Sequence, residues 1–366
     1  MLGAVDRALA IAERRISLVE RCHPTNYIAE QRRLLEAWRT GTHCAPHWQY
    51  APRPDLADVQ VTLEAVVAHL SPATRGAKGP PAVWADLYLA RAAELLVEAS
   101  LVRAIGTRAF AASAGLRFRV GDASTARRAR ELAGRWIRER PPAAEPRTRS
   151  DSESEPRSLV NTLRRAVGAR RLPVRVEVRR DMAAVAAAAE DVVFVRSGLE
   201  LRERDVERIV VHEIDGHVVP RLAARRATIG LLTVGTARSE DEEGRALALE
   251  GRTGGFDALR RGELGRRHLA ALSVRDGATW SETTQLLCDS GASEEQAVAI
   301  ASRCHRGGGL AREIVYLTSL VRYQDAMAVG VPLERWMARG RIGISAARQL
   351  HDEGVLPQML SSPEAA

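Results

Sequence analysis

The sequence predicts an α+β fold that is predominantly helical, with a small sheet beside one candidate metal-binding helix. Three observations lead to this prediction. Apolar residues recur at three- and four-residue spacing over most of the 366 residues, which is the period of an amphipathic helix. One region instead alternates Val with Arg and Glu, which is typical of a half-buried strand. Directly after it, a helical segment carries two histidines and a glutamate, residue types that bind metals.

Residues 1–138 are predicted to form a series of amphipathic helices. The stretch LYLARAAELLVEASLV shows their apolar spacing most clearly. The predicted helices span residues 3–20, 26–39, 56–70, 82–104 and 124–138. Together they make up an N-terminal helical part.

Residues 139–158 separate this part from the rest of the chain. The stretch RERPPAAEPRTRSDSESEPRS is rich in Pro, Ser and charge and has no apolar periodicity. Such a composition buries too little apolar surface to fold alone, so we expect a disordered linker or loop. Residues 159–366 then contain the candidate site, either separately or as one composite domain with residues 1–138.

Two strands and a long helix are predicted next. LPVRVEVRR (172–180) and DVVFVRS (191–197) are the expected strands of the small sheet. ERDVERIVVHEIDGHVVPRLAARR is then predicted as a helix with Ile209, Val210 and Ile214 on its apolar side. The remainder is helical, interrupted by RGGG at 306–309.

The composition indicates a cytoplasmic protein. No run of about 18 apolar residues is present, and the N-terminus carries charges every few residues in place of an apolar signal core. The net charge is +8 and the pI is near 10, but the positive charge is almost all arginine, spread among glutamates as in RELAGRWIRER. We therefore expect binding neither to nucleic acid nor to a membrane.

The four cysteines are predicted to be reduced thiols. Cys22, Cys44, Cys288 and Cys304 are widely separated and form no C-x-x-C pair. Histidines adjoin two of them, in Cys22-His23 and in His43-Cys44 with His47 nearby, which leaves a second metal site as an alternative. Such spacing recurs by accident, so we do not favour that alternative.

The candidate site centres on HEIDGH, His212 to His217. The zinc-peptidase signature H-E-x-x-H places its histidines four residues apart, about 40° from eclipsed, so that both face one metal. Five residues apart, they differ by about 140° on a regular helix. A π-bulge absorbs one extra residue and is often found at functional sites, and Gly216 makes such a distortion easier. The spacing therefore predicts a bulged metal-binding helix.

A third ligand is expected in the acidic segment SEDEEGRALALEG, 239–251. Catalytic zinc usually has three protein ligands and a water molecule. The segment offers Glu240, Asp241, Glu242, Glu243 and Glu250. A helix N-terminus capped by Ser239 and stabilised by acidic residues is the alternative explanation. Beside the metal-binding helix we favour a ligand, with Glu213 as the general base that accepts a proton from water.

One known family shares both of these motifs. H-E-x-x-G-H followed by E-E-x-R-A is similar to the zinc motifs of dipeptidyl peptidase III, HELLGH and EECRAE. That family accommodates the extra residue in its metal helix. The separation between its two motifs is larger, however, and nothing else in the chain resembles it.

Motifs along most of the chain carry a more extensive resemblance. His212, Glu213 and His217 match H-E-x-x-x-H, and Asp241 to Ala246 loosely match T-Q-E-G-L-A. The remaining matches are PTNYIAEQRRLLEAW and APHWQYAP (24–52) to P-x-N-x-x-E and P-x-F-x-Y, AIGTRAF (104–110) to A-x-G-T-x-x-F, and CHRGGGLAREIVYL (304–317) to F-R-G-G-x-x-T-K-D-x-V-Y-L. In these motifs the chain resembles the microtubule-associated tyrosine carboxypeptidases and their bacterial QEGLA-motif relatives, over about residues 24–330.

The resemblance implies a zincin-like metallopeptidase. Such an enzyme would hydrolyse the C-terminal peptide bond of a peptide or protein and release an aromatic residue such as tyrosine. One Zn²⁺ per chain would be bound by His212, His217 and Glu243. Glu213 and Tyr316 are the expected catalytic residues, the tyrosine as a donor to the developing oxyanion.

Further residues are expected to support the metal or the substrate. They are Glu242, Asp215, Arg306, Arg312, Gly307 and Gly308. The two carboxylates would orient a ligating histidine, and the two arginines would hold the terminal carboxylate of the substrate in a bidentate contact. The glycines would let the main chain approach the substrate, with a plain turn between helices as the alternative.

The chain also departs from the family pattern. Arg245 stands in place of a leucine, Ala311-Arg312-Glu313 stands in place of Thr-Lys-Asp, and the Asn-Gly that follows the metal helix is missing. These changes affect the substrate pocket and leave the metal ligands intact. Two other functions therefore stay open: an aminopeptidase like dipeptidyl peptidase III, which would need an acidic anchor for a free amine, and a non-catalytic helical scaffold.

Overall fold

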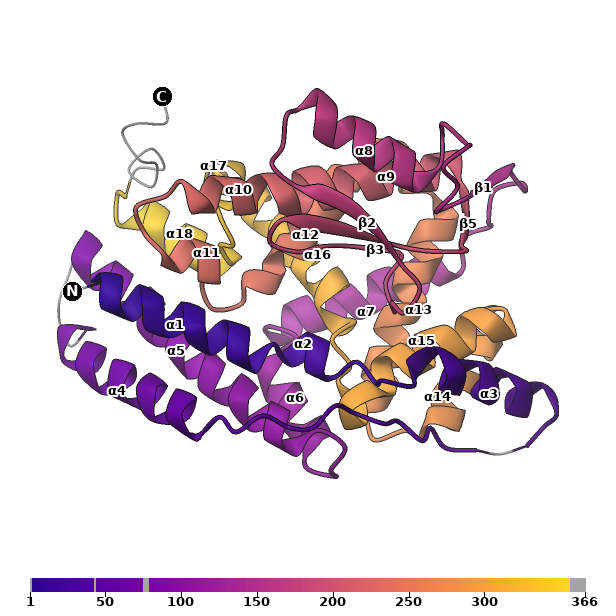
Figure 1. Cartoon of the computed structure of the whole chain (residues 1–366), viewed down its shortest axis with the longest axis horizontal. Helices are drawn as coiled ribbons and strands as arrows, with labels where there is room; N and C mark the ends of the chain where they lie inside the picture. Colours follow the sequence, from indigo (N-terminus) through magenta and orange to yellow (C-terminus); the bar gives the residue numbers. More distant parts are fainter. Residues whose placement is uncertain (1, 43, 75–78, 356–366) are drawn as a thin grey trace.

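The computed structural model describes residues 2–42, 44–74 and 79–355 (Figure 1). The predicted fold class is confirmed in its outline, because helices dominate and small sheets accompany them. The helices of the first part are α1 (Leu2–Ile16), α2 (Leu18–Arg21), α3 (Tyr27–Arg39), α4 (Ala57–Thr74), α5 (Pro80–Ala104), α6 (Phe110–Arg117) and α7 (Ala123–Ile137). The helix predicted at residues 3–20 is divided at Ser17, whose φ of 38° is left-handed.

The second part is also mainly helical. Its elements are α8 (Leu159–Ala169), α9 (Glu203–Val211), the π-helix η1 (His212–Val218), α10 (Val219–Arg225), α11 (Leu231–Val234), the 3-10 helix η2 (Ser239–Asp241), α12 (Glu242–Glu250), α13 (Ala258–Arg275), α14 (Trp280–Asp289), α15 (Glu294–Gly309), α16 (Ile314–Ala328), α17 (Leu333–Met337) and α18 (Ile344–Asp352).

Two small sheets accompany the helices. In the larger one, β4 (Val192–Arg196) lies between β2 (Arg175–Arg179), which is parallel to it, and β3 (Ala186–Ala188), which is antiparallel. The smaller sheet pairs β1 (Arg147–Arg149) with β5 (Glu200–Arg202). The two strands predicted at 172–180 and 191–197 are confirmed as β2 and β4. The edge strand β3 was missed, because three alanines carry no strand signal.

The hydrophobic residues form one large core and one smaller core. The large core runs from Val5 to Val355 and includes residues of α1, α5, α13 and α16, so the N-terminal helices and the later helices share it. The smaller core joins the sheet to α8, α9 and η1 and contains Ile209 and Ile214, as the apolar side of the predicted helix required. In Figure 1 α8 lies at the top, the strands β2 and β3 lie below it at the height of α12 and α16, and α1, α4 and α5 lie at the lower left.

Part of the segment predicted to be disordered is ordered. Within residues 139–158, β1 pairs with β5, and Ser150 is fully buried. The hydroxyl of Ser150 donates a hydrogen bond to the carbonyl of Arg196 in β4 (2.6 Å). This correction has a simple cause: the segment obtains its hydrogen bonds from the neighbouring sheets and needs no apolar periodicity of its own.

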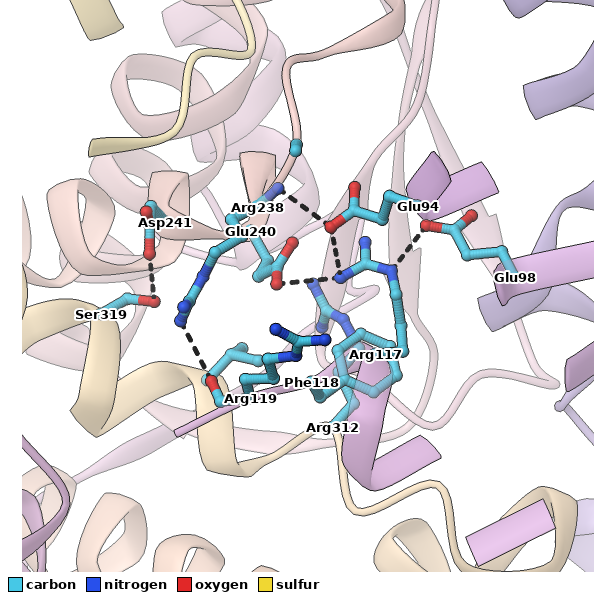
Figure 2. A network of polar contacts seen from close by, with 12 residues as sticks. Glu94, Glu98, Arg117, Phe118, Arg119, Arg238, Glu240, Asp241, Arg312 and Ser319 are labelled. Atoms are coloured by element: carbon cyan, nitrogen blue, oxygen red, sulfur yellow. Dashed lines mark hydrogen bonds and ion pairs between the residues drawn. The ribbon is translucent and has the colours of Figure 1, made fainter. Parts of the chain in front are cut away.

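A buried group of charges joins α5 and α6 to the segment that leads into α12 (Figure 2). The guanidinium of Arg117 pairs with Glu94 (3.1 Å), Glu98 (2.7 Å) and Glu240 (2.9 Å). Burial opposes ionisation of Glu98, but Arg117 and Arg91 lower its pKa to about 2. Because breaking a buried ion pair costs about 3–5 kcal/mol, this group holds η2 and the start of α12 firmly against α5.

His268 of α13 is a buried histidine with no hydrogen-bond partner on either ring nitrogen among the described residues. Its side chain lies in the large core's helix layer, and the residue is 1% exposed. Burial, together with Arg130 and Arg275, lowers its pKa to about 4. An unfolded histidine binds its proton near pH 6.5, so acid favours the unfolded chain as the pH falls from about 6.5 to about 4.

We expect His268→Met to flatten the pH dependence of stability in this range. The parent should lose about 2 kcal/mol of unfolding free energy between about pH 7 and about pH 5 through this one group, since about 1.5 pKa units lie in that range and each corresponds to about 1.4 kcal/mol. Methionine takes up no proton and fills a similar volume. Denaturant unfolding at about pH 7 and about pH 5 would measure the difference. His351→Gln, at an exposed position, serves as the control and should leave the slope unchanged; equal slopes for parent and His268→Met would contradict the expectation.

Candidate active site

The extra residue of HEIDGH is accommodated by a π-helix, as the spacing predicted. The helix runs through α9, η1 and α10 without a break, and the seven residues His212–Val218 form wider turns with π geometry. This brings the two histidines to one face. Their Nε2 atoms are 3.2 Å apart and their ring centroids 4.9 Å apart. Both side chains are almost fully buried.

Two glycines allow three helices to pack closely around the histidines. A Cβ atom on Gly216 would lie 2.7 Å from Cβ of Ala246, so glycine lets η1 lie directly against α12. A Cβ atom on Gly244 would lie 2.3 Å from the carbonyl oxygen of Ser319, so glycine also lets α12 lie against α16. The sequence argument for Gly216 rested on backbone freedom, whereas the structure shows close packing.

Glu243 completes a set of three ligand atoms. It lies in the first turn of α12, and its Oε2 is 3.4 Å from Nε2 of His212 and 3.8 Å from Nε2 of His217. Oε2 is buried and accepts no hydrogen bond from the described residues. A tetrahedral zinc with bonds of 2.0–2.1 Å separates its ligand atoms by about 3.3 Å. The three residues therefore fit zinc in chemistry and in spacing.

Within the described residues, His212, His217 and Glu243 are the one group with metal-binding geometry. The alternative site suggested by Cys22 and Cys44 does not form there, and His43 lies outside the described residues. The capping explanation of the acidic segment also lacks its hydrogen bond, because neither η2 nor α12 has a side-chain cap and Ser239 is not the N-cap residue of either.

The ligand set is strongly polar in spite of its burial. Burial opposes the negative charge of Glu243, but the two histidines and Arg312 together hold its pKa well below its usual value. Burial likewise opposes the positive charge of His212, whose pKa is raised by Glu243 and Glu250. A negative ligand is thus present without a metal, which is the protonation state that metal binding requires of a carboxylate.

Each histidine has a carboxylate behind it. Nδ1 of His212 lies 2.7 Å from Oε1 of Glu250, and Nδ1 of His217 lies 3.5 Å from Oε1 of Glu242. Burial opposes ionisation of Glu242, but His217 and Arg221 lower its pKa to about 2. The predicted supporting position of Glu242 therefore agrees with the geometry.

Asp215 occupies a different position from the predicted one. Its carboxylate forms a bidentate ion pair with Arg170, the C-cap residue of α8, instead of contacting a histidine. Asp215 therefore faces the C-terminal end of α8. Glu250, which the sequence left among five candidates, stands behind His212 in its place.

Glu213 is held by the edge strand that the sequence did not reveal. The amide of Ala188 in β3 donates a hydrogen bond to Oε2 of Glu213 (2.9 Å). The carbonyl of the same residue accepts a hydrogen bond from Arg221, which also lies 3.6 Å from Glu242. The strand thus fixes the direction of the expected general base from one side of η1.

Arg312 contacts the metal ligand Glu243. Its Nη2 donates to Oε1 of Glu243 (3.1 Å), which leaves Oε2 facing the histidines. Arg312 is thus already paired with Glu243, and its predicted contact with a substrate carboxylate stays a prediction. Burial opposes its positive charge, whereas Tyr316 and Glu243 raise its pKa. The two acceptors could not be told apart from the sequence, because both are carboxylates.

Tyr316 lies beside this group in a second layer. Its hydroxyl accepts a hydrogen bond from Arg303 (3.3 Å), and the guanidinium of Arg267 lies 5.6 Å from the centre of its ring. Arg303 in turn forms an ion pair with Glu313. No hydrogen bond among the described residues joins Tyr316 directly to the histidines or Glu243, and its predicted catalytic role remains a prediction.

The predicted break at RGGG is confirmed as a sharp turn inside α15. Arg306 is extended, and Gly307 and Gly308 have φ values of 74° and 105°. A Cβ atom on Gly307 would lie 2.7 Å from the ring of Phe110. The amide of Gly307 donates to the hydroxyl of Tyr50 (2.6 Å).

The motifs upstream in the chain meet at this turn. The amide of Gly106 donates to the carbonyl of Gly307 (2.8 Å). Asn26 forms two hydrogen bonds with the main chain of the extended segment before Tyr50, at His47 and Gln49 (2.9 Å each). One structural role is therefore shared by three segments that are far apart in the sequence, 24–30, 45–50 and 104–110. They hold the RGGG turn in place.

Arg306 is the buried cation at the centre of this turn. The residue is 5% exposed, its Nε has no hydrogen-bond partner, and no carboxylate among the described residues lies within ion-pair distance of it. Its neighbours include Cys22 and Tyr50, and burial raises the thiol pKa of Cys22 to about 12 although Arg306 opposes this rise. A buried charge without a partner is costly, so Arg306 is suited to an anionic ligand.

His212, His217 and Glu243 surround one point, and Glu213 lies on the same helix as the two histidines; metallopeptidases use these residue types to bind zinc and to transfer a proton. The sequence model of the microtubule-associated tyrosine carboxypeptidase family matches residues 42–364, and the chain belongs to this family. The resemblance seen in the motifs is thereby confirmed, and the family implies carboxypeptidase activity.

Other comparisons add little. No curated protein matches the chain. One solved structure, "the putative lipoprotein from Colwellia psychrerythraea", is similar with a TM-score of 0.44 and 13% sequence identity, over 80% of this chain and 70% of that one.

Proposed function

We propose that the protein is a zinc-dependent carboxypeptidase with one Zn²⁺ per chain, held by His212, His217 and Glu243. The observation that carries this proposal is the spacing of the three ligand atoms, 3.2 to 3.8 Å, around a point where Oε2 of Glu243 has no other partner. When bound, zinc would polarise the scissile carbonyl and lower the pKa of a water molecule in its open position.

The residues around the metal ligands would perform the remaining steps. Glu213, aimed by the amide of Ala188, would accept a proton from the attacking water and pass it to the leaving amine. Tyr316 is proposed as a donor to the developing oxyanion, and its burial beside Arg303 supplies a polarised hydroxyl. Arg312 would keep Glu243 on the metal through a single oxygen.

Arg306 is proposed to bind the terminal carboxylate of the substrate. No carboxylate of the described residues pairs with this buried arginine, and a planar guanidinium binds a carboxylate with two parallel hydrogen bonds. The turn at Gly307 and Gly308 would let the substrate main chain pass close to it. A carboxypeptidase needs such a charge, whereas an aminopeptidase would need an acidic group at this place.

The arrangement of the sheet supports a zincin-like fold. β3 is an edge strand, and Ala188 at its end contacts both Glu213 and Arg221 of the metal-binding helix.

The family supports a peptide or protein C-terminus as the substrate and an aromatic residue such as tyrosine as the product. No helix of the described residues is long and apolar enough to cross a membrane. We propose a cytoplasmic enzyme that binds neither nucleic acid nor membrane. The family match disfavours the two alternatives, an aminopeptidase like dipeptidyl peptidase III and a helical scaffold.

Zinc content and its removal test this proposal. Elemental analysis of the purified protein should find one zinc per chain, and a chelator should abolish hydrolysis of peptides with a free C-terminus. Adding zinc back should restore it. His217→Ala should bind no zinc, since it removes one of three ligands. A parent protein that hydrolyses peptides equally well with and without zinc would rule the proposal out.

A further inference from the structure

A chain of buried charges runs along α13 behind the metal-binding helix. It begins at Glu250, whose two oxygens accept hydrogen bonds from Nε and Nη2 of Arg260 (3.0 and 2.9 Å). Arg260 also donates to Glu263 (3.1 Å), and Glu263 pairs with Arg267 (2.5 Å). Arg267 lies over the ring of Tyr316. The chain therefore extends from a metal ligand to the expected oxyanion donor.

Glu250 is the member that touches a ligand. Its residue is fully buried, and Oε1 lies 2.7 Å from Nδ1 of His212. The guanidinium of Arg260 binds both oxygens of Glu250 at the same time, and Nη1 of Arg208 lies 3.7 Å from Oε2 of Glu250. The carboxylate cannot turn away from His212 without giving up its two buried hydrogen bonds to Arg260.

The position of the Glu250 carboxylate fixes the direction of the His212 ring. Nδ1 lies 2.7 Å from Glu250, so Nε2, on the other side of the ring, faces His217 and Glu243, which is where the metal would lie.

We propose that Glu250 is a positioning residue for the metal ligand His212, and that Arg260 of α13 is the group that keeps it in place. This inference rests on the proposed zinc site. The second histidine is held less tightly, because Glu242 is 3.5 Å from Nδ1 of His217 and its nearest arginine, Arg221, is 3.6 Å away. His212 is therefore the rigid ligand, and zinc affinity depends on α13, a helix that contributes no ligand.

Zinc affinity, measured by competition with a chelator, tests the inference without any peptide substrate. Glu250→Asp keeps the charge and the partner Arg260 but withdraws the carboxylate from His212 by one methylene. We expect its zinc affinity to fall about 10–100-fold, as when such a supporting partner is lost. Glu250→Gln, which keeps the length and loses the charge, provides a second variant. In the cobalt-substituted protein, both changes should also alter the visible absorption spectrum.

Glu263→Gln is the matched control. Glu263 binds the other side of Arg260, does not touch His212 and has a side chain 35% exposed. The Glu263→Gln protein should bind zinc as tightly as the parent, even if it unfolds at a lower temperature. Equal zinc affinity in the parent and Glu250→Asp, or equal losses in Glu250→Asp and Glu263→Gln, would overturn the positioning role. A parent without zinc would overturn the proposed function itself, and the two failures are thus distinguishable.

Discussion

Glu213→Gln should keep its zinc and hydrolyse peptides about 10²–10⁴-fold more slowly than the parent. The amide of glutamine accepts no proton at neutral pH, whereas the carboxylate of Glu213 can. The side chain should stay in place, because its oxygen still accepts the hydrogen bond from the amide of Ala188. Single-turnover rates on a free-acid peptide, together with elemental analysis of the same sample, would measure both expectations.

Glu207→Gln is the control for this change. Glu207 is an exposed glutamate of α9 and should affect neither rate nor metal content. A parent-like rate for Glu213→Gln would show that another group is the base. Loss of zinc from Glu213→Gln would show that the residue serves the metal site as a whole and would leave its role in proton transfer without support.

The second large effect concerns Arg306. Arg306→Met removes a buried cation while keeping an apolar stem of similar volume. Losing a charge-assisted contact with a buried carboxylate costs about 2–5 kcal/mol, so kcat/KM on free-acid peptides should fall about thirtyfold to several thousandfold. Peptides with an amidated C-terminus should be poor substrates for the parent and change little in the variant.

Arg312→Met is the contrasting variant. Arg312 binds Glu243 (3.1 Å), so its loss should lower zinc affinity, whereas Arg306→Met should keep parental zinc affinity. The folded state of Arg306→Met should be at least as stable as the parent, because Arg306 forms no ion pair with any of the described residues. Mass spectrometry of the products decides the direction of cleavage. Dipeptides released from N-termini, with amidated peptides cut as fast as free acids, would support the aminopeptidase alternative.

The sequence was most informative where one periodic pattern dominates. The amphipathic helices and the strands β2 and β4 follow from apolar spacing alone. The edge strand β3 did not, because Ala186–Ala188 takes its strand geometry from its antiparallel partner β4 and not from its own residues. Missing this strand left a functional contact unpredicted, since β3 supplies the amide that orients Glu213.

The site shows the same limit. The grouping of His212, His217 and Glu243 could be predicted, because a π-bulge brings histidines five residues apart to one face and the acidic segment was expected to supply a third candidate ligand. The partners of Glu250 and Arg312 could not, since the contacts join residues that the sequence separates by 38 and 69 positions. Tyr50 was visible as part of a motif, but its hydrogen bond to Gly307 depends on how a whole extended segment lies.

The π-helix has a consequence for any attempt to simplify it. Deleting one residue between Glu213 and His217 would restore the common H-E-x-x-H spacing, yet it would rotate every later residue of the helix by about 100°. Arg221 would then swing away from both Ala188 and Glu242, which it now bridges. A shortened motif would thus gain regular ligand spacing and lose the strand that aims its base. The inserted residue therefore sets the rotation of the helix about its axis, which both the ligand spacing and the contacts with the sheet require.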